Sequence, residues 1–179
     1  MKDLLRLRTS LSEEIELLLN EQIKAEAYSS AVYLAMSSYC NRNGFDHSAG
    51  YLEKQSNEER GHMLKIFKYV NDLGGRAISP EVTNIPQEFE SFKTVFELSL
   101  QQEIKVTGQL NRIADQCIRL KDYTTFEFIQ WFLKEQIEEE YVARRILELF
   151  DLIGEEGTGR WQIDKQIPKV SYGESTDEE

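Results

Sequence analysis

Hydrophobic side chains recur at steps of three and four residues along four stretches of this chain. Steps of that size lie on one face of an α-helix, so the pattern predicts four amphipathic helices. At 1.5 Å of rise per residue, each helix would be about 40 to 45 Å long. The predicted helices run from Ser10 or Ser12 to about Cys40, from about Asp46 to Asp72, from Ser91 to about Leu120, and from about Thr124 to Ile153.

Turn-forming residues separate these stretches. Asn-Arg-Asn-Gly at 41–44 and Lys-Asp-Tyr-Thr at 121–124 are short breaks, so the helices on either side of each should form antiparallel hairpins. The second helix stops at Gly74 and Gly75, and residues 77–86 contain two prolines and no hydrophobic period. This connection can span about 50 Å when extended, enough to travel the length of a bundle. The pattern therefore predicts an all-α four-helix bundle with one long crossover.

The C-terminal part is less regular. Gly-Glu-Glu-Gly-Thr-Gly at 154–159 ends the fourth helix, and residues 160–168 are predicted to form a short helix or an extended piece. We expect one domain over residues 11–168, an N-terminal extension at 1–10 and a polar acidic tail at 169–179.

Composition narrows the possible partners. The net charge of −11 and the pI near 4.8 argue against a nucleic-acid partner, because phosphates repel an acidic surface. No uncharged run approaches the length of about 20 residues that a membrane span requires. The charged N-terminus does not fit a secretory signal. Cys40 and Cys117 form no Cys-x-x-Cys motif and are expected to be buried thiols. We therefore expect a cytoplasmic protein with no membrane partner.

Polar residues interrupt the inward-facing stripe of every predicted helix near its midpoint. Because the midpoints of equally long helices lie at one depth in a bundle, these polar groups should converge in the core. The carboxylates among them are Glu26, Glu59, Glu103 and Glu139. Like charges in a low-dielectric core must be protonated or must bind cations, and cations satisfy this requirement better at neutral pH.

Each of these residues has a simpler explanation when it is taken alone. A single glutamate can lie beside the stripe, because a shift of one residue turns the helix by about 100°. His62 can be a boundary histidine, and Tyr33 and Gln136 can be packing residues. Their joint occurrence favours a metal site, and the spacing of Glu59 and His62 places both on one face. Oxygen ligands with one imidazole suit Fe, Mn or Zn without selecting among them.

Four segments carry a resemblance to a known family. The segments at 20–33, 58–62, 128–132 and 135–140 are similar in order and spacing to the bacterial non-haem ferritins, and the resemblance covers roughly residues 11–168. It implies the ferritin-like four-helix bundle with one long crossover, followed by a short C-terminal helix.

The resemblance also implies a ferroxidase centre, the catalytic site that oxidises iron. Glu26, Glu59 and His62 would form its first iron site. Glu59 would bridge to a second site completed by Glu103 and Glu139. The residues beside these sites would be Gln136, Tyr33 and Trp131, and a third iron site would comprise Glu58, Glu135 and Glu138, with Glu139 shared. Tyr33 would either supply an electron or serve only as a hydrogen-bonded core residue.

The sequence departs from related patterns at three positions. Glu138 stands where bacterioferritin and a generic di-iron bundle have the histidine of a second Glu-x-x-His motif. Arg60 stands where bacterioferritin has its haem-ligating methionine, so haem is not expected. Ile137 replaces the histidine that many bacterial relatives have between the third-site glutamates.

The function implied by the resemblance is iron storage with ferroxidase activity. Each subunit would bind two to three iron ions, and O₂ or H₂O₂ would oxidise Fe²⁺ to Fe³⁺ there. The Fe³⁺ mineral would be stored in a homo-oligomeric shell of 24 subunits. One alternative is a di-iron peroxidase or oxidase of the rubrerythrin kind without mineral storage. The absence of a rubredoxin-like Cys-x-x-Cys module and of a second Glu-x-x-His motif counts against it. A second alternative is a binding protein whose centre holds Zn²⁺ or is vestigial.

Overall fold

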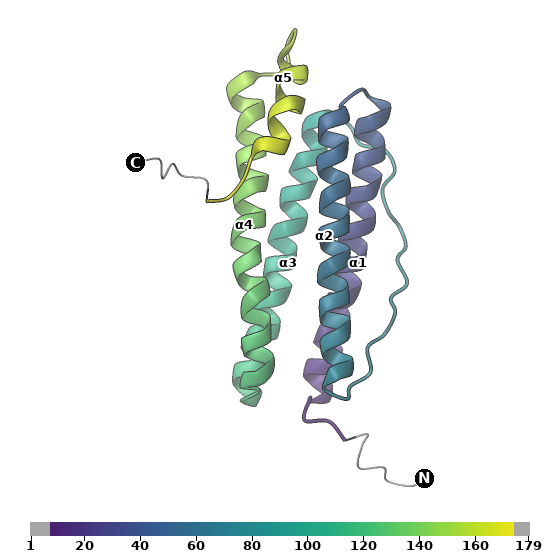
Figure 1. Cartoon of the computed structure of the whole chain (residues 1–179), viewed down its shortest axis with the longest axis vertical. Coiled ribbons are helices and arrows are strands. Elements are labelled where there is room, and N and C mark those ends of the chain that lie inside the picture. Colours follow the sequence, from purple (N-terminus) through teal and green to yellow (C-terminus); the bar gives the residue numbers. More distant parts are fainter. Residues whose placement is uncertain (1–7, 174–179) are drawn as a thin grey trace.

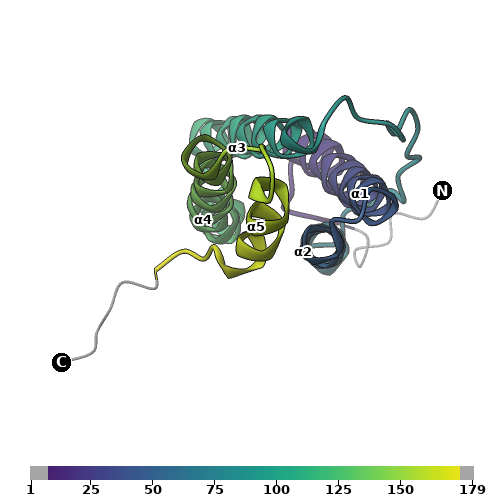
Figure 2. The same ribbon diagram turned by 90° about the horizontal axis from the view of Figure 1, so that it is seen from above.

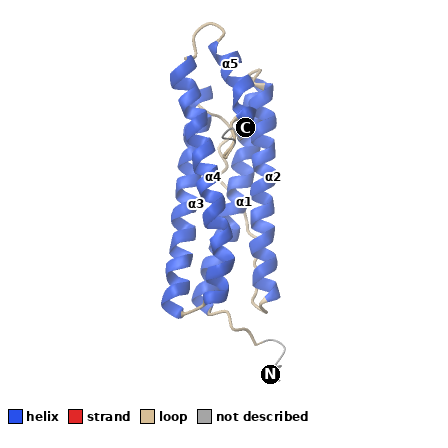
Figure 3. Ribbon diagram, turned by 60° about the vertical axis from the view of Figure 1, so that its left-hand side comes forward, coloured by secondary structure: helices blue, strands red, loops and turns tan. Residues whose placement is uncertain are grey.

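The computed structural model describes residues 8–173, which form helices and connecting loops with no strand in that range (Figure 3). The expected extension at 1–10 and tail at 169–179 therefore lie partly outside the described residues. The helices are α1 (Glu13–Arg42), α2 (Asp46–Asp72), α3 (Phe92–Leu120), α4 (Tyr123–Ile153), α5 (Gly159–Gln166) and the 3₁₀-helix η2 (Ile167–Lys169).

Side-chain caps explain where three of the long helices begin. Ser12 accepts a hydrogen bond from the backbone N–H of Ile15 at 3.2 Å, so it is the N-cap of α1. Ser91 and Asp122 cap α3 and α4 in the same way. The first helix extends two residues beyond its predicted end at Cys40, because helical hydrogen bonding continues to Arg42.

The predicted topology is confirmed. The helices α1 and α2 form one hairpin, α3 and α4 form another, and the crossover runs along α1 so that α3 starts parallel to α2 (Figure 1). The side chain of Asn20 holds the crossover near its start, donating to the carbonyl of Arg76 at 3.1 Å and accepting from the N–H of Ile78 at 2.8 Å. An ion pair between Arg42 and Glu88, with a length of 3.0 Å, links its far end to α1.

Two hydrophobic clusters fill the bundle, one toward each end. Ile15, Ile66, Leu110 and Phe132 belong to the cluster around the start of α1. The other cluster is rich in aromatic residues and includes Phe92, Phe96 and Phe150. Each fully buried side chain of this size contributes about 1.5 to 3 kcal/mol. The polar residues of the inward stripes lie between the two clusters, so the hydrophobic core is interrupted at mid-height.

The C-terminal segment folds as the short helix α5, which lies across the end of the bundle between α4 and α2 (Figure 2). Ile163 and Ile167 are fully buried in the aromatic-rich cluster. The carboxylate of Asp164 accepts hydrogen bonds from the backbone N–H of Ser48 at 2.8 Å and from its hydroxyl at 2.6 Å. Asp164 thus caps α2, whose own N-cap residue supplies no side-chain bond. No helix among residues 8–173 has the length and apolar run needed to cross a bilayer.

Candidate metal centre

The polar layer of the bundle is buried. Glu26 and Glu103 are each 1% exposed, Glu59 is 5% exposed, and Gln136 is 4% exposed. Glu26 belongs to α1, Glu59 to α2, Glu103 to α3 and Gln136 to α4. Each is buried because it lies on the inward stripe of its helix. Glu139, one helical turn beyond Gln136, is half-buried.

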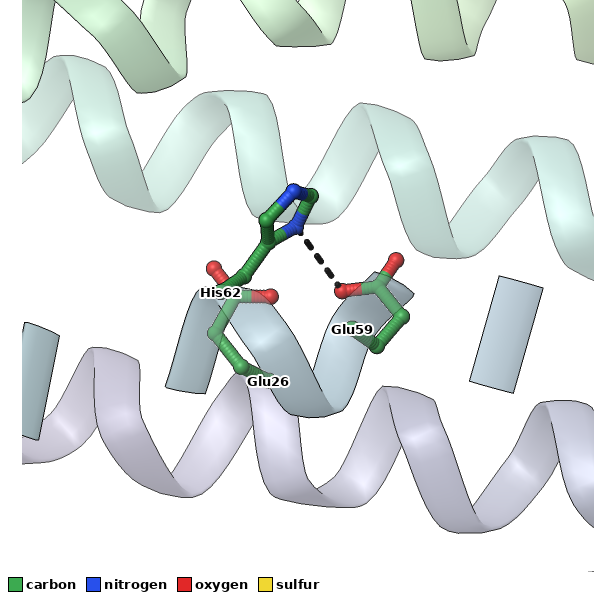
Figure 4. A group of neighbouring side chains, drawn as sticks. All are labelled: Glu26, Glu59 and His62. Carbon is green, nitrogen blue, oxygen red and sulfur yellow. Dashed lines mark ion pairs between the residues drawn. The ribbon is translucent and has the colours of Figure 1, made fainter. Parts of the chain in front are cut away.

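Three of the predicted ligands form a compact group. Glu26 reaches in from α1, and Glu59 and His62 come from consecutive turns of α2 (Figure 4). One ligand atom from each residue lies within 4.8 Å of the others. The Nδ1 atom of His62 is 3.5 Å from a carboxylate oxygen of Glu59. This separation suits atoms that surround a common ion, because metal–ligand bonds of about 2 Å place neighbouring ligands about 3 to 4 Å apart.

The electrostatics of this group favour a cation. Burial, followed by the negative charge of Glu59, raises the pKa of Glu26 well above its usual value. Burial also raises the pKa of Glu59, followed by the charge of Glu103. The Oε2 atoms of both glutamates are buried and make no hydrogen bond within the described residues. A bound cation would remove the repulsion between the glutamates and compensate for the hydrogen bonds that these two oxygens lack.

Glu103 is held differently. Tyr33 donates a short hydrogen bond to its Oε1 atom, and the Nε2 atom of Gln136 donates to its Oε2 atom at 3.1 Å. The Tyr33 hydroxyl also lies 2.9 Å from the hydroxyl of Ser99. Burial raises the pKa of Glu103, while the bonds from Tyr33 and Gln136 oppose that shift. Glu103 is therefore oriented by the protein even without an ion.

Glu139 lies where the buried layer meets the more exposed face of α4. Burial, followed by the charges of Glu103 and Glu58, raises its pKa to about 8. These carboxylates thus act on one another electrostatically, although neither Glu103 nor Glu139 belongs to the compact group of three.

The predicted third-site residues form a less buried set. Glu58 and Glu135 are half-buried and Glu138 is exposed. Glu58 accepts a short hydrogen bond from Gln55 and lies 3.2 Å from the ammonium of Lys54. Within the described residues, these three carboxylates do not converge as Glu26, Glu59 and His62 do.

Trp131 contacts the ring of His62, and Lys65 lies on the ring of Trp131. Trp131 is 39% exposed and places its ring edge-on to His62, with 5.6 Å between the ring centroids. The ammonium of Lys65 lies over the Trp131 ring. The sequence prediction named Trp131 as a neighbour of the centre, and it did not identify Lys65.

Gln22 was also not identified from the sequence as a hydrogen-bond partner of the site. Its Nε2 atom donates to Glu26 at 2.8 Å, and the residue is 1% exposed. The available signal was its spacing, because it precedes Glu26 by four residues on the same stripe. Tyr51 was missed as well. Its hydroxyl donates at 3.4 Å to Gln55, which in turn donates to Glu58.

Comparison with known proteins gives consistent matches over most of the chain. Residues 16–153 match the family model for the ferritin-like domain. A probable bacterial non-heme ferritin-like protein of Haemophilus influenzae is 37% identical over 161 residues, covering 90% of this chain and 98% of the relative. A bacterial non-heme ferritin of Campylobacter jejuni is also 37% identical, with coverage of 90% and 96%. A crystal structure of an open-pore ferritin from Archaeoglobus fulgidus aligns with a TM-score of 0.85 at 35% identity, covering 88% of this chain and 98% of that one.

Proposed function

This chain belongs to the ferritin family of iron-storage proteins, and we propose that it oxidises Fe²⁺ at the polar layer of its own bundle before storing it as Fe³⁺ mineral. The observation that carries the proposal is the convergence of Glu26, Glu59 and His62 inside an otherwise hydrophobic bundle. Buried carboxylate oxygens without hydrogen bonds are costly unless the carboxylate is protonated or binds a cation.

Two iron ions are the substrate of the proposed reaction. One ion would bind to Glu26, Glu59 and His62. The other would bind to Glu103 and Glu139, with Glu59 shared between the two. A shared carboxylate suits ions about 3.5 to 4 Å apart, the usual spacing of two-metal sites.

The proposed step balances with O₂ as the oxidant. Each of two Fe²⁺ ions gives up one electron, and O₂ takes both electrons and two protons to become H₂O₂. When H₂O₂ is the oxidant, two Fe²⁺ ions and two protons convert it to two water molecules. The carboxylates favour the product, because their attraction to an ion increases with its charge. Their raised pKa values also mean that Fe²⁺ entry displaces protons.

Tyr33 and the outer carboxylates have supporting roles in this proposal. Tyr33, through its bond to Glu103, would orient that ligand and could supply a further electron to the oxidant. Glu58, Glu135 and Glu138 would hold a third ion, with Glu139 shared. No haem forms part of the proposed mechanism.

We also propose assembly into a shell of 24 copies in the cytoplasm. The structural similarity to the open-pore ferritin of Archaeoglobus fulgidus supports the assembly. The two cysteines, Cys40 and Cys117, are free and buried, which agrees with the reducing cytoplasm.

Stepwise aerobic addition of Fe²⁺ to metal-free protein tests the proposed function. After each addition, size-exclusion chromatography would follow protein and iron together. Iron that co-elutes with a large shell, far beyond a few ions per chain, is the expected result. A small oligomer that oxidises iron but retains only its site ions would overturn storage and favour a di-iron oxidase.

A further inference from the structure

A groove between α1 and α3 has no role in the iron chemistry described above. Its volume is about 590 Å³, within the range of small-molecule sites. The two helices lie side by side in Figure 2, and Pro86 of the crossover also lines the groove. Its floor includes Ser29 and Val106, each one helical turn from a predicted iron ligand.

The groove changes character along its length. Toward one end lie Lys24 of α1 and Lys105 of α3, with Glu21 and Gln109 one turn beyond them, and the other end is lined by Met36 and Leu98. The helices run in opposite directions, so the two lysines lie at a similar height. Twelve residues separate Lys24 from Met36, which corresponds to about 18 Å along the helix. The groove therefore carries a pair of lysines toward one end and is apolar at the other.

The charge of this lysine pair is not neutralised. Lys24 and Lys105 are exposed and form no ion pair within the described residues. Glu21, the acidic residue of the groove, lies 3.5 Å from the guanidinium of Arg112. Two buried amide atoms of the groove have no hydrogen-bond partner within residues 8–173: the acceptor Oε1 of Gln109 and the donor Nε2 of Gln102, which lies one turn from Lys105 and is the one that suits an anion. In a chain of net charge −11, these groups form a local site for an anion.

We propose that this groove binds a single-chain carboxylate amphiphile, the chemical class of medium-chain fatty acids. The carboxylate lies between Lys24 and Lys105 and accepts a hydrogen bond from the amide of Gln102. The hydrocarbon chain follows the groove toward Met36 and Leu98. This occupant matches both the charge at one end and the apolar surface at the other.

Calorimetric titration of the assembled, metal-free protein with hexanoate, octanoate and decanoate tests the proposal. If the chain is buried, each added methylene should lower the Kd about fourfold, so each step of two carbons should lower it about 15-fold. Decylamine has a cationic head and should bind at least about tenfold more weakly than decanoate. Equal binding of decanoate and decylamine, or no binding of decanoate to the assembled protein, would overturn the proposal.

Variants locate the two ends of the ligand. The double variant Lys24→Glu/Lys105→Glu should weaken all three acids by about tenfold or more. Lys165→Glu/Lys169→Glu makes the same change in net charge near the C-terminus and serves as the matched control, with little expected effect. Leu98→Glu should instead reduce the gain per methylene. If the control pair weakens binding as much as the groove pair, the site lies elsewhere and the proposal fails.

Discussion

The two halves of the candidate centre hold their carboxylates in different ways. Glu26 has one donor, Gln22, and its second oxygen has no partner within the described residues. Glu103 receives hydrogen bonds at both oxygens, from Tyr33 and from Gln136. The buried charge of the first half therefore has to be offset by protonation or by a bound cation, while the second half is already oriented by the protein.

The number of hydrogen-bond donors around a buried carboxylate determines the free-energy cost of burying it. A buried carboxylate with hydrogen-bond donors has exchanged water for protein partners at little net cost, whereas one without donors retains its desolvation penalty. Binding of an ion should therefore relieve more strain at Glu26 and Glu59 than at Glu103. Substitutions in the two halves should accordingly differ in their effects on iron oxidation, stability and metal binding.

Removing the charge of Glu59 should have the largest effect. Glu59→Gln keeps the size of the side chain and takes away the charge proposed to be shared by both ions. We expect rapid Fe²⁺ oxidation, followed by absorbance after mixing with O₂, to slow by about 100-fold, because the ligand contributes several kcal/mol at a metal site. The metal-free variant should also be more stable at pH 8, since one buried charge is gone.

The exposed Glu53 of α2 provides the matched control for this change. Glu53→Gln should leave both oxidation and stability nearly unchanged. Unaltered rapid oxidation in Glu59→Gln would refute its role as the shared ligand.

The raised pKa of Glu139 predicts how the stability of the metal-free protein depends on pH. Its pKa rises from an ordinary value of 4.5 to about 8 in the folded protein, so the folded state binds this proton more tightly than the unfolded state. The resulting stabilisation is complete below about pH 4.5 and is lost as the pH rises to about 8. We expect Glu139 to account for roughly 2 to 4 kcal/mol of that loss, allowing for its partial exposure.

Urea unfolding of the metal-free protein at pH 5 and pH 8.5 measures this contribution. Glu139→Gln should lose less stability than the wild type between the two pH values. Glu138→Gln, on the exposed face of α4, is the control and should behave like the wild type. An identical loss in Glu139→Gln and the wild type would contradict the raised pKa.

The main features of the fold were predictable from the sequence because they depend on local periodicity. Steps of three and four residues identified Glu26, Glu59 and Glu103 as inward-facing, and all three are buried. The position of α5 was not predictable, because eight residues carry too little periodicity. The contact of Asp164 with Ser48 joins residues 116 positions apart, and no local pattern encodes such a contact.

The sequence revealed less about how the site is organised. Spacing placed Gln22 on the same stripe as Glu26, but every polar residue on an inward stripe fits that pattern. It could not show that Gln22 donates to Glu26 or that Tyr33 donates to Glu103. Nor could it distinguish the compact group of three ligands from the half-buried Glu139, because exposure depends on how closely the neighbouring helices pack.

The hydrogen-bond partners of the two halves offer a direct comparison. Gln22→Leu removes the donor to Glu26, and we expect binding of the first Zn²⁺, used as a redox-inert probe, to weaken by about tenfold or more. Tyr33→Phe should weaken binding by only about threefold, because Gln136 still holds Glu103. Calorimetric titration of both metal-free variants measures this ratio. Equal losses in the two variants would show that the halves are supported alike.

The smallest effect is expected at the outer carboxylates. Glu138 is exposed and does not belong to the compact group of ligands, so Glu138→Ala should change the initial rate of Fe²⁺ oxidation by less than about twofold, as is usual for surface positions. Its proposed role is to hold a third ion, so anaerobic titration should find one Fe²⁺ fewer per chain than in the wild type. A rate loss comparable to that of Glu59→Gln would mean that the outer carboxylates act in the oxidation step itself. Glu138 would then belong to the catalytic centre despite its exposure.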